Sequence, residues 1–237
     1  MHVNELKVKP SFLPDLFQIG YDKTGVLVID DFAANLDQVR EDAGCGRAYQ
    51  NDGLTAYPGI RRVAPDSYVN PLMAAFVPVL RKVHSIPDDL EARCELAFYS
   101  LLTKAGADLD VAQRLPHSDT NKQHYYAILH YLNAGNYGGT GFFRHRPTRF
   151  ERVTEDRREI YNQSVSAFMA VRGLPAHQYI NASNNHFELF SQVDYKPNRV
   201  VAYPGCLLHS ALVTEDEDVS DDPAIGRLTA NVFVSFS

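Results

Sequence analysis

The sequence predicts a mainly β fold with flanking helices (α+β), in which an antiparallel sandwich or barrel follows a helical region. Helical patterns occupy the first part of the chain. After about residue 90, short segments rich in Tyr, Phe, Val and Ile follow one another, each bounded by Asn, Gly, Pro or Asp. Segments of this kind are typical of short strands joined by tight turns, and a run of them after a run of helices indicates a β structure flanked by helices.

The first part of the chain predicts one strand and two helices. Residues 25–30 are apolar and β-branched, which indicates a buried strand. Residues 35–42 have the pattern of a short helix. Asn70 precedes a proline and predicts the start of a second helix, whose apolar residues continue at helical spacing through residues 71–83. Pro78 interrupts this segment, so we expect a kink or two separate pieces there.

The later part of the chain predicts six strands and one helical insertion. The insertion is the charged segment 149–171, in which apolar residues recur at helical intervals. The predicted strands are residues 94–103, 124–133, 186–193, 199–203, 207–213 and 228–236.

Length and composition indicate a single soluble domain. The chain has 237 residues, of which 45% are hydrophobic and 22% charged, as in globular proteins with a core. The net charge of −6 argues against a nucleic-acid partner. No stretch is long and apolar enough for a membrane span. Residues 1–7 lack the apolar segment of a secretory signal, and the three cysteines are isolated, so we expect a cytoplasmic protein with free thiols.

Three residues form a candidate metal site. His117 and Asp119 are two residues apart, and on extended chain such side chains point to the same side. His209 lies in an apolar segment, where its ring nitrogens need partners. Two histidines and one carboxylate on one face leave other coordination positions open, which is the arrangement of non-haem iron(II) sites that use dioxygen. Taken singly, each residue has a structural alternative: a solvated H-x-D loop and a core histidine.

Arg227 is a candidate for binding an acidic cosubstrate. An iron-bound keto acid needs a cation for its far carboxylate, and arginine can bind a carboxylate through two hydrogen bonds. Arg227 begins the last predicted strand, and Thr229 shares its face. The alternative is an arginine at the surface edge of a strand.

Five short segments of the sequence match the motifs of a known family. They are His117-Ser-Asp119, Tyr131-Leu-Asn133, Gly138-Gly-Thr-Gly-Phe142, Tyr203-Pro-Gly205 with His209-Ser210, and Arg227-Leu-Thr229. In this order they resemble the motifs of the prolyl 4-hydroxylase-like 2-oxoglutarate/iron(II) dioxygenases. Residues 28–32 are similar to the opening strand of that family. The resemblance covers most of residues 25–237.

The resemblance implies a double-stranded β-helix, a jelly-roll or cupin-like barrel, in one dioxygenase domain spanning residues 1–237. Residues 1–90 would supply the first strand and the supporting helices, and residues 91–237 the core. It also implies Fe(II) bound by His117, Asp119 and His209. The residues that it assigns to 2-oxoglutarate are Arg227, Thr229, Tyr131 and Tyr99.

The implied activity is that of a hydroxylase or related oxygenase. Such an enzyme uses dioxygen and 2-oxoglutarate to oxidise a small-molecule or peptide substrate, and it releases succinate and CO2. Two alternatives remain: a binding or regulatory module on the same barrel, and a different metal-dependent cupin-type enzyme. The presence of all three candidate ligands and of Arg227 favours the oxygenase. Neither the substrate nor the oligomeric state follows from the sequence.

Two charged segments stand out in the later part of the chain. Residues 144–172 contain seven arginines and four acidic residues, so the insertion could cover the site as a lid, with Arg144 and Arg146 attracting an anionic substrate. The alternative is that its charges pair along a solvated helix face. The acidic segment 215–222 predicts a solvated loop.

Overall fold

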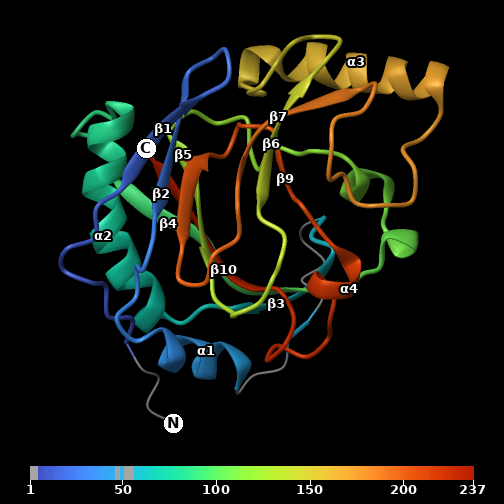
Figure 1. Cartoon of the computed structure of the whole chain (residues 1–237). Coiled ribbons are helices and arrows are strands. Elements are labelled where there is room, and N and C mark those ends of the chain that lie inside the picture. The colour runs from blue at the N-terminus through green and yellow to red at the C-terminus, as the bar shows by residue number, and fades with distance from the viewer. Residues whose placement is uncertain (1–4, 46–48, 51–55) are drawn as a thin grey trace.

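The computed structural model describes residues 5–45, 49–50 and 56–237. Within them, the strands form two antiparallel sheets, a large one of seven strands and a small one of three (Figure 1). In spatial order the large sheet consists of β1 (Asp15–Ile19), β2 (Thr24–Ile29), β8 (Val200–Pro204), β5 (Tyr125–Tyr131), β10 (Leu228–Phe236), β4 (Ala92–Leu102) and β3 (Gly59–Val63), and the small sheet of β7 (Phe187–Val193), β6 (Thr140–His145) and β9 (His209–Ala211).

Helices cover the large sheet on one side. Apolar residues of α1 (Leu36–Gly44) and α2 (Asp66–His84) share one hydrophobic core with alternate residues of the sheet. The other side of the sheet packs against the small sheet, where Phe142 of β6 and Tyr203 of β8 meet edge to face at 5.3 Å. The fold is therefore mainly β with flanking helices, as the sequence predicts. The remaining helices are α3 (Glu155–Arg172), α4 (Glu215–Asp218), and the 3-10 turns η1 (Gly106–Asp108) and η2 (Val111–Arg114).

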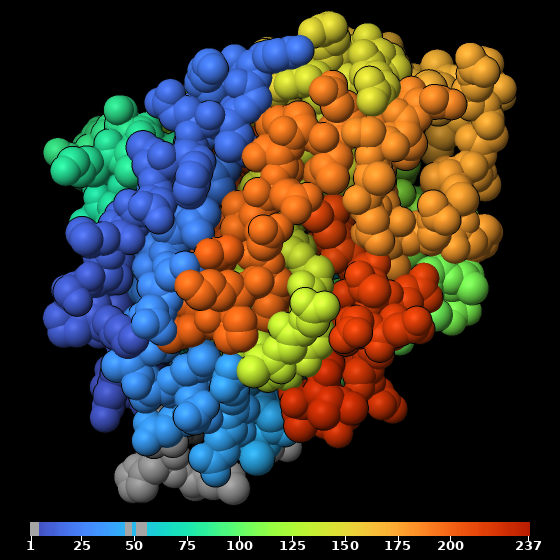
Figure 2. Space-filling model, in the orientation of Figure 1, coloured from blue at the N-terminus to red at the C-terminus, as the bar shows by residue number. Residues whose placement is uncertain are grey.

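Segments far apart in the chain are neighbours in the sheets. Strand β2 pairs with β8 over Leu27–Ala202, Val28–Val201 and Ile29–Val200. In the space-filling view the blue N-terminal segment and the orange segment of the later chain accordingly lie side by side on one surface (Figure 2).

The alternation along β10 decides which side chains reach the space between the sheets. Leu228, Ala230 and Val232 pack in the core beneath the helices. Their neighbours Thr229 and Asn231 face the opposite side, toward the small sheet. The last strand therefore supplies one row of residues to the core and another to a cavity.

The second helix begins earlier than the sequence predicted, at Asp66 rather than Asn70. It continues through Pro71 and Pro78 as one element, so of the two expectations at Pro78 the separate pieces are excluded. A proline has no N–H, so the carbonyl four residues earlier loses its helical partner. At Pro71 this carbonyl belongs to Ser67, and it accepts a hydrogen bond from the backbone N–H of Leu6 at 2.9 Å. The N-terminal segment thus compensates for the proline.

The expectation of no secretory signal depends partly on residues 1–4, which lie outside the described residues. No helix within residues 5–45, 49–50 and 56–237 has both the length and the hydropathy to cross a bilayer.

Candidate metal centre

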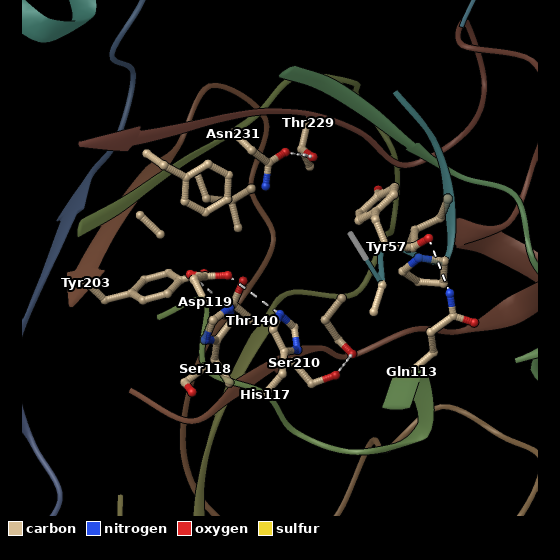
Figure 3. A pocket seen from close by; sticks show the side chains of 18 of the residues that line it. Tyr57, Gln113, His117, Ser118, Asp119, Thr140, Tyr203, Ser210, Thr229 and Asn231 are labelled. Carbon is tan, nitrogen blue, oxygen red and sulfur yellow. Dashed lines mark hydrogen bonds and ion pairs between the residues drawn. The ribbon is translucent and has the colours of Figure 1, made fainter. Parts of the chain in front are cut away.

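A cavity of about 400 Å³ lies between the small sheet and the side of the large sheet that faces away from α1 and α2. Side chains from both sheets and from the segment after η2 line it (Figure 3). Five residues singled out from the sequence are among the lining residues: His117, Asp119, His209, Arg227 and Thr229. The structure therefore brings the three candidate ligands and the candidate cosubstrate residues into one space.

Backbone hydrogen bonds place the three candidate ligands together. His117 and His209 form an antiparallel pair, in which each backbone N–H donates to the other residue's carbonyl at 2.9 Å. Residues paired in this way project their side chains to the same side. The N–H of Asp119 donates to the carbonyl of Gly205 at 2.7 Å, in the turn that leads from β8 toward β9. The arrangement therefore depends on the backbone and not on contacts between the three side chains.

The three side chains have the spacing of a metal site. One ligand atom from each residue lies within 4.8 Å of the others. The Nε2 atoms of His117 and His209 are each 3.8 Å from an oxygen of Asp119, too far for hydrogen bonds. A divalent ion at the centre would satisfy all three groups at once. Two imidazoles and one carboxylate suit iron(II) and neighbouring divalent transition metals.

A second contact orients His209. Its Nδ1 lies 2.8 Å from the carbonyl oxygen of Leu207. A carbonyl only accepts, so Nδ1 carries the proton and Nε2 keeps its lone pair for the cluster. Backbone carbonyls commonly fix the tautomer of metal-binding histidines in this way.

The surrounding protein shifts the pKa values of the cluster. Burial lowers the pKa of His117 and of His209 to about 4, and for His117 the neighbouring ring of His209 adds to the effect. The exposed part of the His117 side chain faces the cavity, where the protein around it reduces its solvation. Burial also raises the pKa of Asp119 to about 6. At neutral pH both histidines are therefore neutral and Asp119 is ionised, as metal binding requires.

These pKa values predict how metal affinity depends on pH. Between about pH 4 and pH 6 a metal ion has to displace one proton from Asp119, whereas the histidines are already neutral. We expect the apparent affinity for Ni(II) to rise about tenfold per pH unit in this interval and to level off above it. Titration calorimetry at several pH values measures this. An affinity that stays constant from pH 4 to pH 6 contradicts the assignment of Asp119.

Arg227 is buried and held firmly at one end of the cavity. Only 3% of its surface is exposed, and its Nε donates to the carbonyl of Gly138 at 2.8 Å. Its Nε also lies 3.5 Å from a carboxylate oxygen of Asp218. A side chain at position 138 would collide with the carbonyl oxygen of Leu212, so a glycine is required where Arg227 docks. Arg227 is thus a fixed cation and not a surface arginine.

Asp218 corrects the prediction for the acidic segment. It belongs to α4 and has no exposed surface, whereas the sequence predicted a solvated loop. Its carboxylate accepts hydrogen bonds from the backbone N–H groups of Gly138 and Thr214, at 2.9 and 2.7 Å. Burial raises the pKa of Asp218, and the nearby Arg227 opposes that shift. The two residues form a buried ion pair behind the cavity.

Tyr131 lies beside Arg227. The guanidinium carbon of Arg227 is 5.5 Å from the centre of the Tyr131 ring. The Tyr131 hydroxyl is hydrogen-bonded to the Thr140 hydroxyl, with 2.7 Å between the oxygens. Because Tyr131 is fully buried and Thr140 lines the cavity, Tyr131 supports the wall at this end.

The structure places Tyr99 away from the cavity. In the register of β4 and β10, Tyr99 is opposite Ala230, which faces the helices. The Tyr99 ring packs against Tyr68 of α2 at 5.4 Å, and its hydroxyl donates to Asp42 at 3.4 Å. Tyr99 therefore does not line the cavity as the sequence led us to expect, because alternation along the strand points its side chain to the other face.

The helical insertion does not line the cavity either. Helix α3 confirms the predicted helix, but none of its residues is among the lining residues. Arg144 is buried, stacks on Tyr21 at 3.7 Å, and donates to Glu151 and Glu188. Arg146 donates to a backbone carbonyl. Arg144 and Arg146 are thus already paired, away from the cavity, which does not support the lid. The pairing along a solvated helix face that the sequence offered as the alternative is seen for Arg158 with Glu155.

Several lining residues outside the quoted motifs were not singled out from the sequence. They come from segments that sequence patterns leave unassigned, such as β3 and the turn of η2, or from alternate positions on predicted strands. The clearest are Tyr57, Arg61, Gln113, Tyr179 and Asn231. Asn231 alone could have been found, since it shares the predicted face of Arg227 and Thr229.

Comparisons with known proteins give one family and several similar structures. Two crystal structures of HygX from Streptomyces hygroscopicus each cover 91% of this chain and 83% of their own. The one with nickel, 2-oxoglutarate and hygromycin B bound has 16% identity and a TM-score of 0.46, and the one with iron bound has 14% identity and a TM-score of 0.42. No curated protein matches the chain. The model of a family described as "Family of unknown function (DUF6445)" matches residues 10–234, and the chain therefore belongs to that family.

Proposed function

We propose that the chain is an iron(II)- and 2-oxoglutarate-dependent oxygenase with a double-stranded β-helix as its core. Its substrate is a small molecule or a peptide, which it hydroxylates with release of succinate and CO2. The observation that carries the proposal is one cavity lined by two histidines, one carboxylate and a buried arginine. The sequence motifs resembling the prolyl 4-hydroxylase-like dioxygenases fall on these same residues.

The winding of the chain supports the proposed core. From β4 onward the chain alternates between the sheets: β4 and β5 belong to the large sheet, and the bridge of His117 to β9 lies between them in sequence. Strands β6 and β7 then belong to the small sheet, β8 to the large, β9 to the small and β10 to the large. A jelly roll winds its strands between two facing sheets in this way.

Each group of residues has a role in the proposed reaction. His117, Asp119 and His209 would hold iron, which supplies the oxidising chemistry when bound. Arg227 would bind the far carboxylate of 2-oxoglutarate by charge-assisted hydrogen bonds. The aromatic and aliphatic walls, among them Tyr203 and Phe233, limit the water that reaches the bound molecules.

Turnover of the cosubstrate tests the proposal. We expect the protein reconstituted with Fe(II) to convert 2-oxoglutarate to succinate and CO2 slowly in air, even without a substrate. Omission of metal and replacement by Zn(II) are the controls. A protein that binds Fe(II) and 2-oxoglutarate but forms no succinate would be a binding module. One that binds metal but no 2-oxoglutarate would be a different metal enzyme.

A further inference from the structure

Thr229 and Asn231 are linked on the cavity face of β10. The Thr229 hydroxyl donates to Oδ1 of Asn231 at 2.9 Å. A threonine hydroxyl has a single proton, so this bond uses the only proton that Thr229 could offer to a bound anion. Thr229 is also almost completely buried, with 1% of its surface exposed. The main role of the Thr229 hydroxyl is therefore to hold the Asn231 side chain.

This bond fixes the direction of the Asn231 amide. Its oxygen is held by Thr229, so the NH2 group is turned the other way, into the cavity (Figure 3). Nδ2 has no hydrogen-bond partner within the described parts of the chain, and it is not shut off from the cavity by burial. It is an oriented donor that reaches the cavity. A donor of this kind suits an anionic or carbonyl oxygen.

The position of Asn231 relates it to Arg227 and to the metal cluster. Arg227 directly precedes β10 and lines the same cavity as Asn231, with Cα atoms about 13 Å apart for four residues of extended chain. Arg227 uses Nε and Nη2 on the carbonyls of Gly138 and Gly139, which leaves Nη1 for a ligand. A short dicarboxylate held by Nη1 would extend along this face toward the cluster, past Asn231.

We propose that Asn231 donates a hydrogen bond to the metal-facing end of the dicarboxylate that Arg227 binds. Thr229 is then a positioning residue that acts through Asn231 and does not contact the ligand. This inference rests on the proposed function. It assigns a residue that the sequence motifs do not include and changes the role expected for Thr229.

Binding of 2-oxoglutarate to the Ni(II)-loaded protein, measured by calorimetry without turnover, tests the inference. Asn231→Leu removes the donor and should weaken binding by about 10- to 100-fold, the range for a hydrogen bond to a charged group. Thr229→Val should weaken it less. In the double variant the two effects should not add, because Thr229 has no route to the ligand except through Asn231.

Controls separate this inference from the proposed function. Ser235→Ala, which removes a side-chain hydrogen bond to Glu95 outside the cavity, should bind 2-oxoglutarate like the wild type. All variants should bind Ni(II) with wild-type affinity. If Arg227→Gln loses 2-oxoglutarate while Asn231→Leu keeps it, the inference is overturned and the proposed function stands. Additive losses in the double variant overturn the role of Thr229, and a wild type that binds no 2-oxoglutarate overturns both proposals.

Discussion

Asp119→Asn is expected to abolish metal binding and at the same time to raise the Tm of the metal-free protein. The asparagine keeps the shape of the side chain but loses the charged ligand atom. We therefore expect the affinity for Ni(II) or Fe(II) to fall by more than about 100-fold, which exceeds the usual effect of losing a residue that only hydrogen-bonds to a metal ligand. The gain in Tm has another cause. Burial raises the pKa of Asp119 to about 6, so at neutral pH the fold holds an ionised carboxylate that it disfavours.

The sign of the stability effect follows from that pKa. A carboxyl that binds its proton more tightly in the folded state destabilises the fold as pH rises from about 4 toward 6. The Tm difference between variant and wild type should therefore be largest at neutral pH and vanish near pH 4. Thermal melts with and without Ni(II) measure both effects, since a ligand that binds only the folded state raises its Tm.

A matched control is Asp216→Asn, an exposed carboxylate on α4. It should leave both the metal-free Tm and the Ni(II)-induced shift unchanged. A Ni(II) shift of wild-type size in Asp119→Asn would remove Asp119 from the site. The backbone bonds that pair His117 with His209 do not involve the Asp119 side chain, so misfolding is not an expected explanation for lost binding.

The strands that were predicted from the sequence are those with continuous apolar or β-branched runs. Residues 228–236 form β10 with the predicted bounds, and residues 94–103 correspond to β4. Strand β1 was missed because all but one of its residues are exposed, so it has no buried face to produce a pattern. Strand β3 contains two consecutive arginines, whose side chains stack on aromatic rings that sequence alone does not bring near them.

The structure brings the three candidate ligands together, as expected from the sequence, although only the spacing of the first two is local and His209 joins them through a long-range backbone pair. His117 and Asp119 are two residues apart, and His209 follows a turn between two apolar strands. The role of Tyr99 was not predictable, because a difference of one residue in register decides whether a side chain on β4 faces the cavity or α2. Asp218 was misjudged for a related reason. Its charge suggests solvent, but Arg227 and two backbone N–H groups compensate it in the interior.

The ion pair of Arg227 with Asp218 means that a variant of Arg227 has to be compared with a variant of both residues. Removing one member of a buried pair leaves the other uncompensated and destabilises the fold. The single variant Arg227→Gln therefore mixes lost binding with lost stability. The double variant Arg227→Gln/Asp218→Asn removes both charges, and its amides can still pair with the backbone of Gly138. Comparison of the two variants separates the effects.

We expect both Arg227 variants to bind Ni(II) as the wild type does, and to bind 2-oxoglutarate at least about 30-fold more weakly, the lower end of the range for truncating one partner of a buried charge pair. Calorimetry on Ni(II)-loaded protein measures this, with Arg146→Gln as the matched control, because Arg146 donates to a backbone carbonyl outside the cavity. The double variant should melt closer to the wild type than Arg227→Gln does, yet recover no affinity. If it binds 2-oxoglutarate as tightly as the wild type, the carboxylate is held elsewhere, and Arg227 has only a structural role with Asp218.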